Sequence, residues 1–314
     1  MAARPAADLG RLTIRVVVTG ATGFIGRALV AALLDRGDEV TALTRNPARA
    51  GLDSRVNVLG WNPPEIGSWA EAFSGADGVV NLAGEPIAEK RWTAVQKERI
   101  LRSRVDATNA VVAAIRQAEP RPSVLVNGSA VGHYGPTANE RIDETAVPGA
   151  DFLAFVTQEW ESAARQVEAL GVRLVIVRTG IVLGPGGGAL PRLTLPFRLY
   201  GGGPLSAPNR WLSWIQLEDE VGIILYALDH DVRGAVNATA PNPVTVGEFS
   251  RRIGSTLRSP SWNPLLRTAI NLILGERSSS LFAGQRALPD AIQRAGYEFR
   301  YPELDEALRV SLGR

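Results

Sequence analysis

Short apolar runs alternate with longer amphipathic stretches along the first part of the chain. The short runs are rich in β-branched residues and are bounded by polar or glycine-containing segments, which predicts buried strands. They occupy residues 14–19, 39–43, 56–59, 78–83, 123–129 and 173–178. The stretches between them have helical periodicity. Because strands alternate with helices, we expect a doubly wound parallel α/β sheet with its ligand crevice at the carboxyl ends of the strands.

The pattern changes after Gly184. Glycine and proline are frequent in the segment that follows, which predicts turns and the start of a smaller C-terminal lobe. A strand is expected at residues 234–238, and helices at residues 246–257, 264–274 and 302–312. We therefore divide the chain into a disordered tail (1–11), a first domain (12–185, with a return of 213–240) and a C-terminal substrate lobe (186–314).

Composition narrows the classes of function. The hydrophobic fraction of 45% is ordinary for a globular protein, and no apolar run approaches the roughly 18 residues that span a bilayer. We expect a cytoplasmic protein without membrane association. The sequence has no cysteine and only two histidines, His133 and His230, which argues against a metalloenzyme. Its net charge of +2 comes from scattered residues, so we expect no nucleic-acid partner, and a monomer or homodimer.

A glycine-rich turn follows the first predicted strand. Residues 20–26 read G-A-T-G-F-I-G, and a helical pattern comes directly after them. Gly20 permits the tight turn, Gly23 lets backbone amides approach a pyrophosphate, and Gly26 lets the helix pack on the strand. The spacing and its context predict a Rossmann domain that binds a dinucleotide at the helix N-terminus. We include Thr22, Phe24 and Ile25 of the same turn among the predicted contacts.

The end of the second strand indicates which dinucleotide is bound. An acidic residue here would hold a ribose 2′-hydroxyl, but the sequence has Thr44 and Arg45 instead. Arg45 would form charge-assisted hydrogen bonds with a 2′-phosphate, and Thr44 would add a hydroxyl. The alternative is that Arg45 is a solvated loop arginine. The sequence favours NADP(H) over NAD(H).

Small residues close the fourth predicted strand. Leu82, Ala83 and Gly84 would let the cofactor lie against the backbone. The alternative is a simple turn between a strand and a loop. We predict these three residues as cofactor contacts.

With these residues placed, the chain resembles the extended short-chain dehydrogenase/reductase superfamily. Within it, the chain is similar to an atypical NAD(P)-dependent epimerase-like group of the YfcH type. The resemblance rests on G-A-T-G-F-I-G at 20–26, N-L-A-G-E at 81–85, S-A-V-G at 129–132, W-E-x-A-A at 160–164, R-T-G-I-V-L-G at 178–184 and S-W-I at 213–215. The tail from about residue 265, with A-L-P at 287–289 and G-Y-E-F-R-Y-P at 296–302, looks like the C-terminal domain of unknown function of that group.

The resemblance implies three further cofactor contacts, at Glu98, Arg104 and Val182. A salt bridge from Arg104 to a phosphate is physically reasonable. For Glu98 an ion pair on the helix surface is an equally good interpretation.

The usual catalytic pair of the superfamily, a tyrosine with a lysine four residues later, is missing. The residues four places after the five tyrosines include no lysine. Ser129 matches the superfamily's serine and is predicted to orient a substrate oxygen, with Tyr134 as a proton donor. The alternatives are that Ser129 caps a turn and that Tyr134 is a lid aromatic.

Two functions follow from this sequence. The first is an NADP(H)-dependent reductase or epimerase of an unknown small-molecule substrate, with Trp211 and Trp214 beside the substrate unless they are core residues. The alternative, motivated by the missing tyrosine–lysine pair, is a non-catalytic NADP(H)-binding regulator. The resemblance implies a link of that regulator to cell division.

Overall fold

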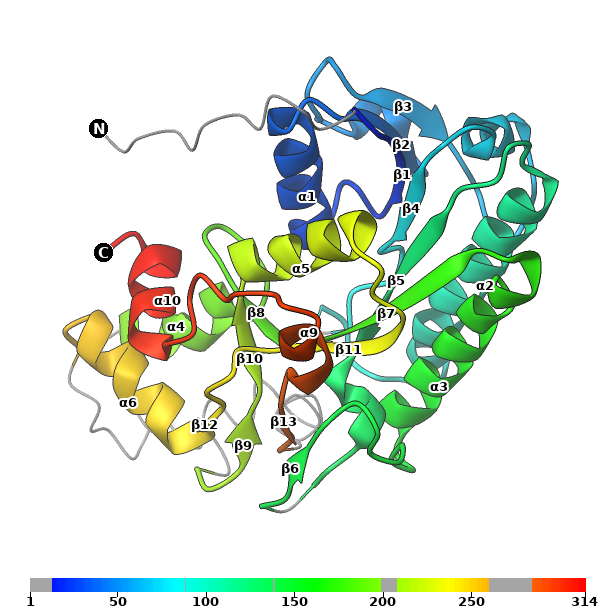
Figure 1. The fold of residues 1–314 in the computed structure, drawn as a ribbon. Coiled ribbons are helices and arrows are strands. Elements are labelled where there is room, and N and C mark those ends of the chain that lie inside the picture. Colours follow the sequence, from blue (N-terminus) through cyan, green and yellow to red (C-terminus); the bar gives the residue numbers. More distant parts are fainter. Residues whose placement is uncertain (1–12, 88, 138, 199–207, 260–283) are drawn as a thin grey trace.

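The computed structural model describes residues 13–87, 89–137, 139–198, 208–259 and 284–314 (Figure 1). Its main sheet has seven parallel strands in the order β11-β7-β5-β4-β1-β2-β3. This order confirms the doubly wound Rossmann-type sheet predicted from the alternating pattern. The strands are β1 (Arg15–Thr19), β2 (Glu39–Thr44), β3 (Asn57–Gly60), β4 (Gly78–Asn81), β5 (Val124–Ala130), β7 (Arg173–Thr179) and β11 (Gly234–Ala238).

Helices cover both faces of this sheet (Figure 1). Helices α1 (Phe24–Asp35) and α5 (Leu217–Asp229) pack on one face, and α2 (Ala94–Gln117) and α3 (Phe152–Arg165) pack on the other. Because successive side chains of a strand point to opposite faces, Val16 and Val18 of β1 join one core while Val17 joins the other. Both cores are apolar, which explains why the strands read as continuous hydrophobic runs.

A second lobe follows β7 and has its own core. Two parallel strands, β8 and β10, and two antiparallel strands, β9 and β12, lie among three helices. The elements are β8 (Ile181–Leu183), α4 (Leu190–Arg198), β9 (Trp211–Leu212), β10 (Trp214–Gln216), β12 (Val244–Thr245), α6 (Val246–Thr256) and α10 (Leu304–Leu312). The fully buried Trp214 is one of its largest core residues.

The end of the chain returns to the first domain. Strand β13 (Arg286–Ala287) pairs with β6 (Arg141–Ile142), and α9 (Asp290–Arg294) packs near β11. Short 3-10 helices complete the described chain: η1 (Pro47–Arg49), η2 (Ser68–Phe73), η3 (Val131–Tyr134) and η4 (Glu168–Leu170). Among the described helices, none has the length and apolar character required to cross a membrane.

Several predicted boundaries need adjustment. Only β11 of the expected return joins the main sheet, because β10 pairs with β8 of the second lobe. Strand β4 ends at Asn81 rather than at residue 83, and the backbone then turns across the end of β1, where Leu82 N donates to Thr19 O at 3.2 Å. The predicted tail 1–11 and the predicted helix 264–274 lie outside the described residues.

Candidate cofactor and active site

A cavity of about 460 Å³, here called the crevice, opens at the carboxyl ends of β1, β4, β5 and β7. Its lining comes from the glycine turn after β1, the loop after β4, the end of β5, helix α3 and the start of β8. In a doubly wound sheet this edge is where ligands bind. The crevice is therefore the candidate functional site.

Most residues predicted from the sequence line this crevice. They are Gly20, Gly23, Phe24, Ile25, Gly26, Leu82, Gly84, Arg104, Ser129 and Val182. Thr22 and Ala83 are chain neighbours of lining residues. Thr44, Arg45, Glu98 and Tyr134 are not among the lining residues, and neither are Trp211 and Trp214. For Trp214 the alternative of a core residue is therefore the correct one.

The glycine turn leaves no space for side chains. Gly20 has φ +67°, and a Cβ there would meet Leu82 O at 2.5 Å. A Cβ on Gly26 would overlap the carbonyl oxygen of Gly20, against which the first turn of α1 packs. Both positions therefore require glycine, as the fingerprint predicts.

The N-terminus of α1 faces this cavity without a capping side chain. Gly23 is the N-cap, it makes no side-chain cap hydrogen bond, and the first turn of α1 contains no acidic residue. The amides of such a turn carry partial positive charge and need acceptors. The chemistry of this end of the crevice fits a pyrophosphate.

Thr44 and Arg45 lie beside the glycine turn. The parallel register pairs Thr19 with Leu43, so the residues after Leu43 emerge at the edge where Gly20 begins the turn. The side chain of Arg45 is exposed. Its charge also helps to lower the pKa of Glu85, after the larger effect of a hydrogen bond from Lys90 at 2.9 Å. Arg45 thus contributes positive charge next to the crevice.

Arg104 is a half-buried cation in the crevice lining. Its guanidinium carbon lies 5.2 Å from the ring centroid of Trp160, and Nη1 donates to the carbonyls of Glu85 at 3.1 Å and Ile100 at 3.0 Å. Burial lowers its pKa to about 10, so it remains charged at neutral pH. Among the described residues, no carboxylate lies within salt-bridge distance of Arg104. The carboxylate of Glu85 stabilises this charge from beyond hydrogen-bonding distance. A half-buried cation whose hydrogen bonds go to carbonyl oxygens favours an anionic ligand.

Glu98 lies elsewhere on α2. Its side chain is 59% exposed, and its carboxylate accepts from Arg102 Nε at 2.8 Å, one helical turn away. The structure thus places Glu98 in the surface ion pair that was the alternative to a cofactor contact.

Ser129 lines the crevice and is hydrogen-bonded to a buried ion pair. Its Oγ donates to Glu161 Oε1 at 2.7 Å, and Arg178 donates to both oxygens of Glu161, each at 2.9 Å. All three side chains are buried. Burial alone would raise the pKa of Glu161, but the hydrogen bonds and charge of Arg178 hold it below its usual value. Glu161 is therefore ionised, and the Ser129 hydroxyl proton points away from the crevice.

Tyr134 is directed into the protein. Its hydroxyl donates to Asn237 Oδ1 at 2.7 Å and accepts from Arg178 Nη1 at 3.0 Å, and the residue is 4% exposed. Burial raises the pKa of Tyr134 to about 12. Both hydrogen-bonding capacities are thus used within the protein, which favours a packing role over proton donation.

Sequence reasoning missed three polar residues at or next to the crevice. Thr179 ends β7 in the lining, and its hydroxyl donates to Glu220 Oε1 at 2.7 Å. Glu220 is fully buried on α5, and burial raises its pKa to about 8. Gln285 comes from the C-terminal part of the chain and donates from Nε2 to Gly135 O at 2.9 Å. The end of a predicted strand could have indicated Thr179, but no local pattern distinguishes Glu220 or Gln285 from surface residues.

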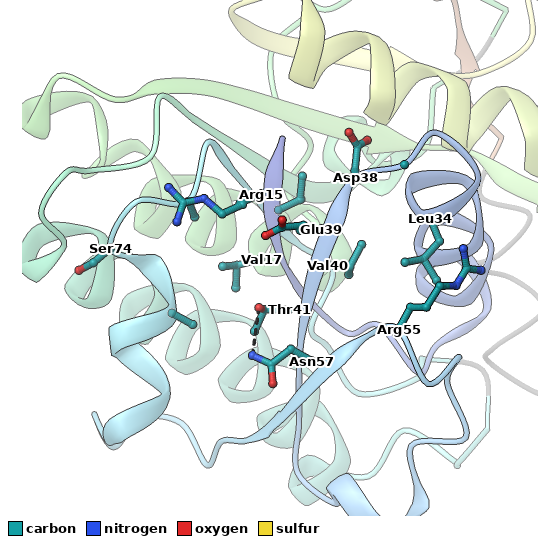
Figure 2. A pocket seen from close by; sticks show the side chains of 14 residues that line it. Arg15, Val17, Leu34, Asp38, Glu39, Val40, Thr41, Arg55, Asn57 and Ser74 are labelled. Carbon is teal, nitrogen blue, oxygen red and sulfur yellow. Dashed lines mark hydrogen bonds between the residues drawn. The ribbon is translucent and has the colours of Figure 1, made fainter. Parts of the chain in front are cut away.

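A larger hollow of about 580 Å³ lies at the opposite edge of the sheet, between the starts of β1, β2 and β3 (Figure 2). Asp38, its buried charged residue, pairs with Arg36 at 2.6 Å, and the exposed Arg55 pairs with Asp53 at 3.0 Å. Thr41 and Asn57 are hydrogen-bonded to each other at 3.3 Å (Figure 2). The buried charge of this hollow is thus already paired within the protein, so size alone does not identify the site.

Comparison with family models gives two matches. Residues 16–239 match the NAD dependent epimerase/dehydratase family, and residues 267–310 match a domain of unknown function, DUF1731. The first match covers the main sheet and the crevice. The second begins outside the described residues and ends in α10.

Comparison with known proteins gives relatives over nearly the whole chain. The chain is 40% identical over 299 residues to the chloroplastic epimerase family protein SDR39U1 homolog of Arabidopsis thaliana, covering 94% of this chain and 86% of that protein. It is 36% identical to epimerase family protein YfhF of Bacillus subtilis, covering 94% and 97%. The crystal structure of human epimerase family protein SDR39U1 with NADPH superposes with a TM-score of 0.85 at 34% identity, covering 96% and 100%.

Proposed function

Because the chain belongs to the NAD dependent epimerase/dehydratase family, we propose that its crevice binds NADP(H) and performs reductase or epimerase chemistry on a small molecule. The observation that carries this proposal is Arg104, a half-buried cation of the crevice lining that has no salt bridge among the described residues, beside the uncapped N-terminus of α1. A pyrophosphate would satisfy both groups. The human relative was solved with NADPH, which supports the same cofactor here.

Different residues around the crevice would bind different parts of the cofactor. The amides after Gly23 and the guanidinium of Arg104 would hold the pyrophosphate, while Thr44 and Arg45 would hold the 2′-phosphate. Leu82 and Val182 supply apolar contacts in the lining. The preference for the phosphorylated cofactor depends on Arg45, because no carboxylate follows β2 in the sequence to repel the phosphate.

The inner part of the crevice has an apolar lining that would exclude water from a reaction. When bound, a nicotinamide donates or accepts a hydride. Phe24, Leu153 and Val156 contribute apolar surface, which protects such a transfer from water. Because the proton of Ser129 is directed to Glu161, the free lone pair of Oγ would accept a hydrogen bond from a substrate hydroxyl and orient it.

Titration with NADPH, NADP, NADH and NAD, followed by nicotinamide or protein fluorescence, tests the proposal. We expect saturable binding, tighter for NADPH and NADP than for NADH and NAD. The absence of binding to all four dinucleotides would refute it. A screen of carbonyl compounds for consumption of NADPH then tests the chemistry.

A non-catalytic, NADP(H)-binding regulator is the second candidate. The observation that favours it is the side of α3 that lines the crevice, where the described residues Leu153, Val156, Thr157 and Trp160 include neither tyrosine nor lysine. A protein partner whose affinity changes with NADPH would support this role. Turnover of any carbonyl compound would count against it.

A further inference from the structure

A second hydroxyl–carboxyl pair lies beside Ser129 and Glu161. Thr179 lines the crevice at the end of β7, and its hydroxyl is bonded to Glu220 Oε1 at 2.7 Å. The register pairs Ser129 with Arg178 and Ala130 with Thr179, so the two hydroxyl-bearing residues lie on neighbouring strands, one step apart. Both residues therefore lie at the crevice edge of the sheet, although their side chains are directed to opposite faces.

The two carboxyl groups behind these hydroxyls lie on opposite faces of the sheet. Arg178 and Thr179 are successive residues of β7, so their side chains alternate: Arg178 binds Glu161 of α3, and Thr179 binds Glu220 of α5. Glu161 has a bidentate arginine. Glu220 has no cation, and its Oε2 has no hydrogen-bond partner among the described residues.

From this arrangement we infer that Thr179 is a catalytic proton donor to a substrate oxygen in the crevice, and that Glu220 resupplies its proton. This inference rests on the proposed function. The pair would take the place of the tyrosine and lysine that the chain lacks. Ser129 and Thr179 each donate to a carboxyl group, but the two carboxyl groups differ. Arg178 keeps Glu161 ionised, so Glu161 holds the Ser129 proton, whereas Glu220 has no cation and, when protonated, can donate to Thr179 Oγ1 and free the Thr179 proton for the substrate. Tyr134 is unsuited because its hydroxyl is engaged by Asn237 and Arg178.

The protonation states of the two carboxyl groups agree with this division. Burial raises the pKa of Glu220 to about 8, so it carries a proton at neutral pH, while Arg178 keeps Glu161 ionised. When their environments separate the pKa values of two carboxyl groups in this way, one group can act as a proton donor and the other remains ionised. The titratable groups near Glu220 are Tyr297, whose own pKa is raised by burial, and Asp219, which accepts from Tyr297 and from two backbone amides.

The proton transfer balances in the direction of reduction. The carbonyl carbon of the substrate receives a hydride, with its electron pair, from the nicotinamide, and the C=O π electrons move to oxygen. That oxygen takes the proton of Thr179 Oγ1, and Thr179 takes the proton of Glu220. The Glu220 carboxylate left behind is reprotonated from water. In oxidation each step runs in reverse, and the substrate hydroxyl proton ends on Glu220.

Infrared difference spectroscopy of the full-length protein tests the path without requiring turnover. We expect a protonated-carboxyl C=O band at pH 7 that disappears as the pH rises above about 8 and is absent in Glu220→Gln. On transfer to D₂O, this band should shift rapidly in the wild type, and the fast phase should be lost in Thr179→Val. Thr157→Val is the matched control, because the Thr157 hydroxyl also lies at the crevice but donates to helix carbonyls.

Two results would overturn the inference: no band sensitive to Glu220→Gln at pH 7, or equally fast exchange in Thr179→Val. Both substitutions nearly preserve the shape of the side chain. If Glu220→Gln does not fold, the exchange rate in Thr179→Val still tests the path, because that variant contains Glu220. NADPH titration of the same samples separates the two proposals. An intact proton path without NADPH binding refutes the proposed function, whereas NADPH binding without the path refutes only the role of Thr179 and Glu220.

Discussion

The two ends of the crevice differ in how far their charged groups are removed from water. At the inner end, Glu161, Arg178 and Glu220 are buried behind the hydroxyls of Ser129 and Thr179. At the outer end, beyond β2, Arg45 is exposed. Charges in water contribute little to folding, whereas buried charges are costly unless they are paired. We therefore expect changes at the inner end to alter stability and changes at the outer end to alter only cofactor affinity.

Replacement of Arg178 at the inner end should have the largest effect on the free energy of unfolding. Arg178→Met leaves Glu161 buried with a hydrogen bond from Ser129 and with Arg165 only at 3.8 Å and His133 at 3.4 Å. Breaking a buried pair costs about 3–5 kcal/mol. Urea denaturation measures this loss of unfolding free energy. The double variant Arg178→Met/Glu161→Met should recover most of it, and Arg55→Met, which breaks an exposed pair at the opposite edge of the sheet, should leave stability unchanged. A mild effect of Arg178→Met alone would mean that the inner end is hydrated.

Glu220→Gln should change how stability depends on pH. The folded-state pKa of Glu220, about 8, lies above its ordinary value of 4.5, so the folded protein binds the proton more tightly than the unfolded chain. Its stabilising contribution is complete below about pH 4.5 and is lost as the pH rises through about 8. Between pH 5 and pH 8 the unfolding free energy of the variant should therefore rise relative to that of the wild type by on the order of 3 kcal/mol.

Denaturation curves at several pH values between 5 and 8 measure this gain. Replacement of the exposed Glu65 by glutamine is the control for loss of a carboxyl group. A wild-type slope that Glu220→Gln leaves unchanged would show that another group controls the pH dependence. In that case the two carboxyl groups of the inner end would not differ in protonation.

The sequence predicted the layers of this molecule better than its polar interior. Apolar runs and the glycine spacing are local signals, so the strands and the turn at Gly20 could be predicted directly, whereas the lining residue Ser129 was predicted from the family resemblance. The pairing of β6 with β13 joins segments far apart in the chain, which no local pattern encodes. Glu161 and Glu220 lie on amphipathic helices, where a single acid normally indicates the solvated face. Their burial depends on partners contributed by β7.

Arg104 lies between the two ends in exposure, because it is half-buried and lines the crevice. Arg104→Met should weaken NADPH binding about 10- to 100-fold, since it removes a charge-assisted bond to a phosphate. The fold should tolerate the change, because the guanidinium bonds only to carbonyl oxygens among the described residues and the methionine can still pack on Trp160. Fluorescence titration measures the affinity. Equal weakening for NADH is expected, because both dinucleotides have the same pyrophosphate.

Arg45→Ala should have the smallest and most selective effect. Because we propose that the exposed guanidinium contacts the 2′-phosphate, we expect NADPH affinity to fall about tenfold while NADH affinity is retained. The difference between the two cofactors should shrink as salt is added, because exposed charges are screened. Glu98→Gln, at an exposed site on α2, is the control and should change neither affinity. An equal loss for NADPH and NADH would instead place Arg45 against the shared pyrophosphate, and the distinction between a buried inner end and a solvated outer end would then fail.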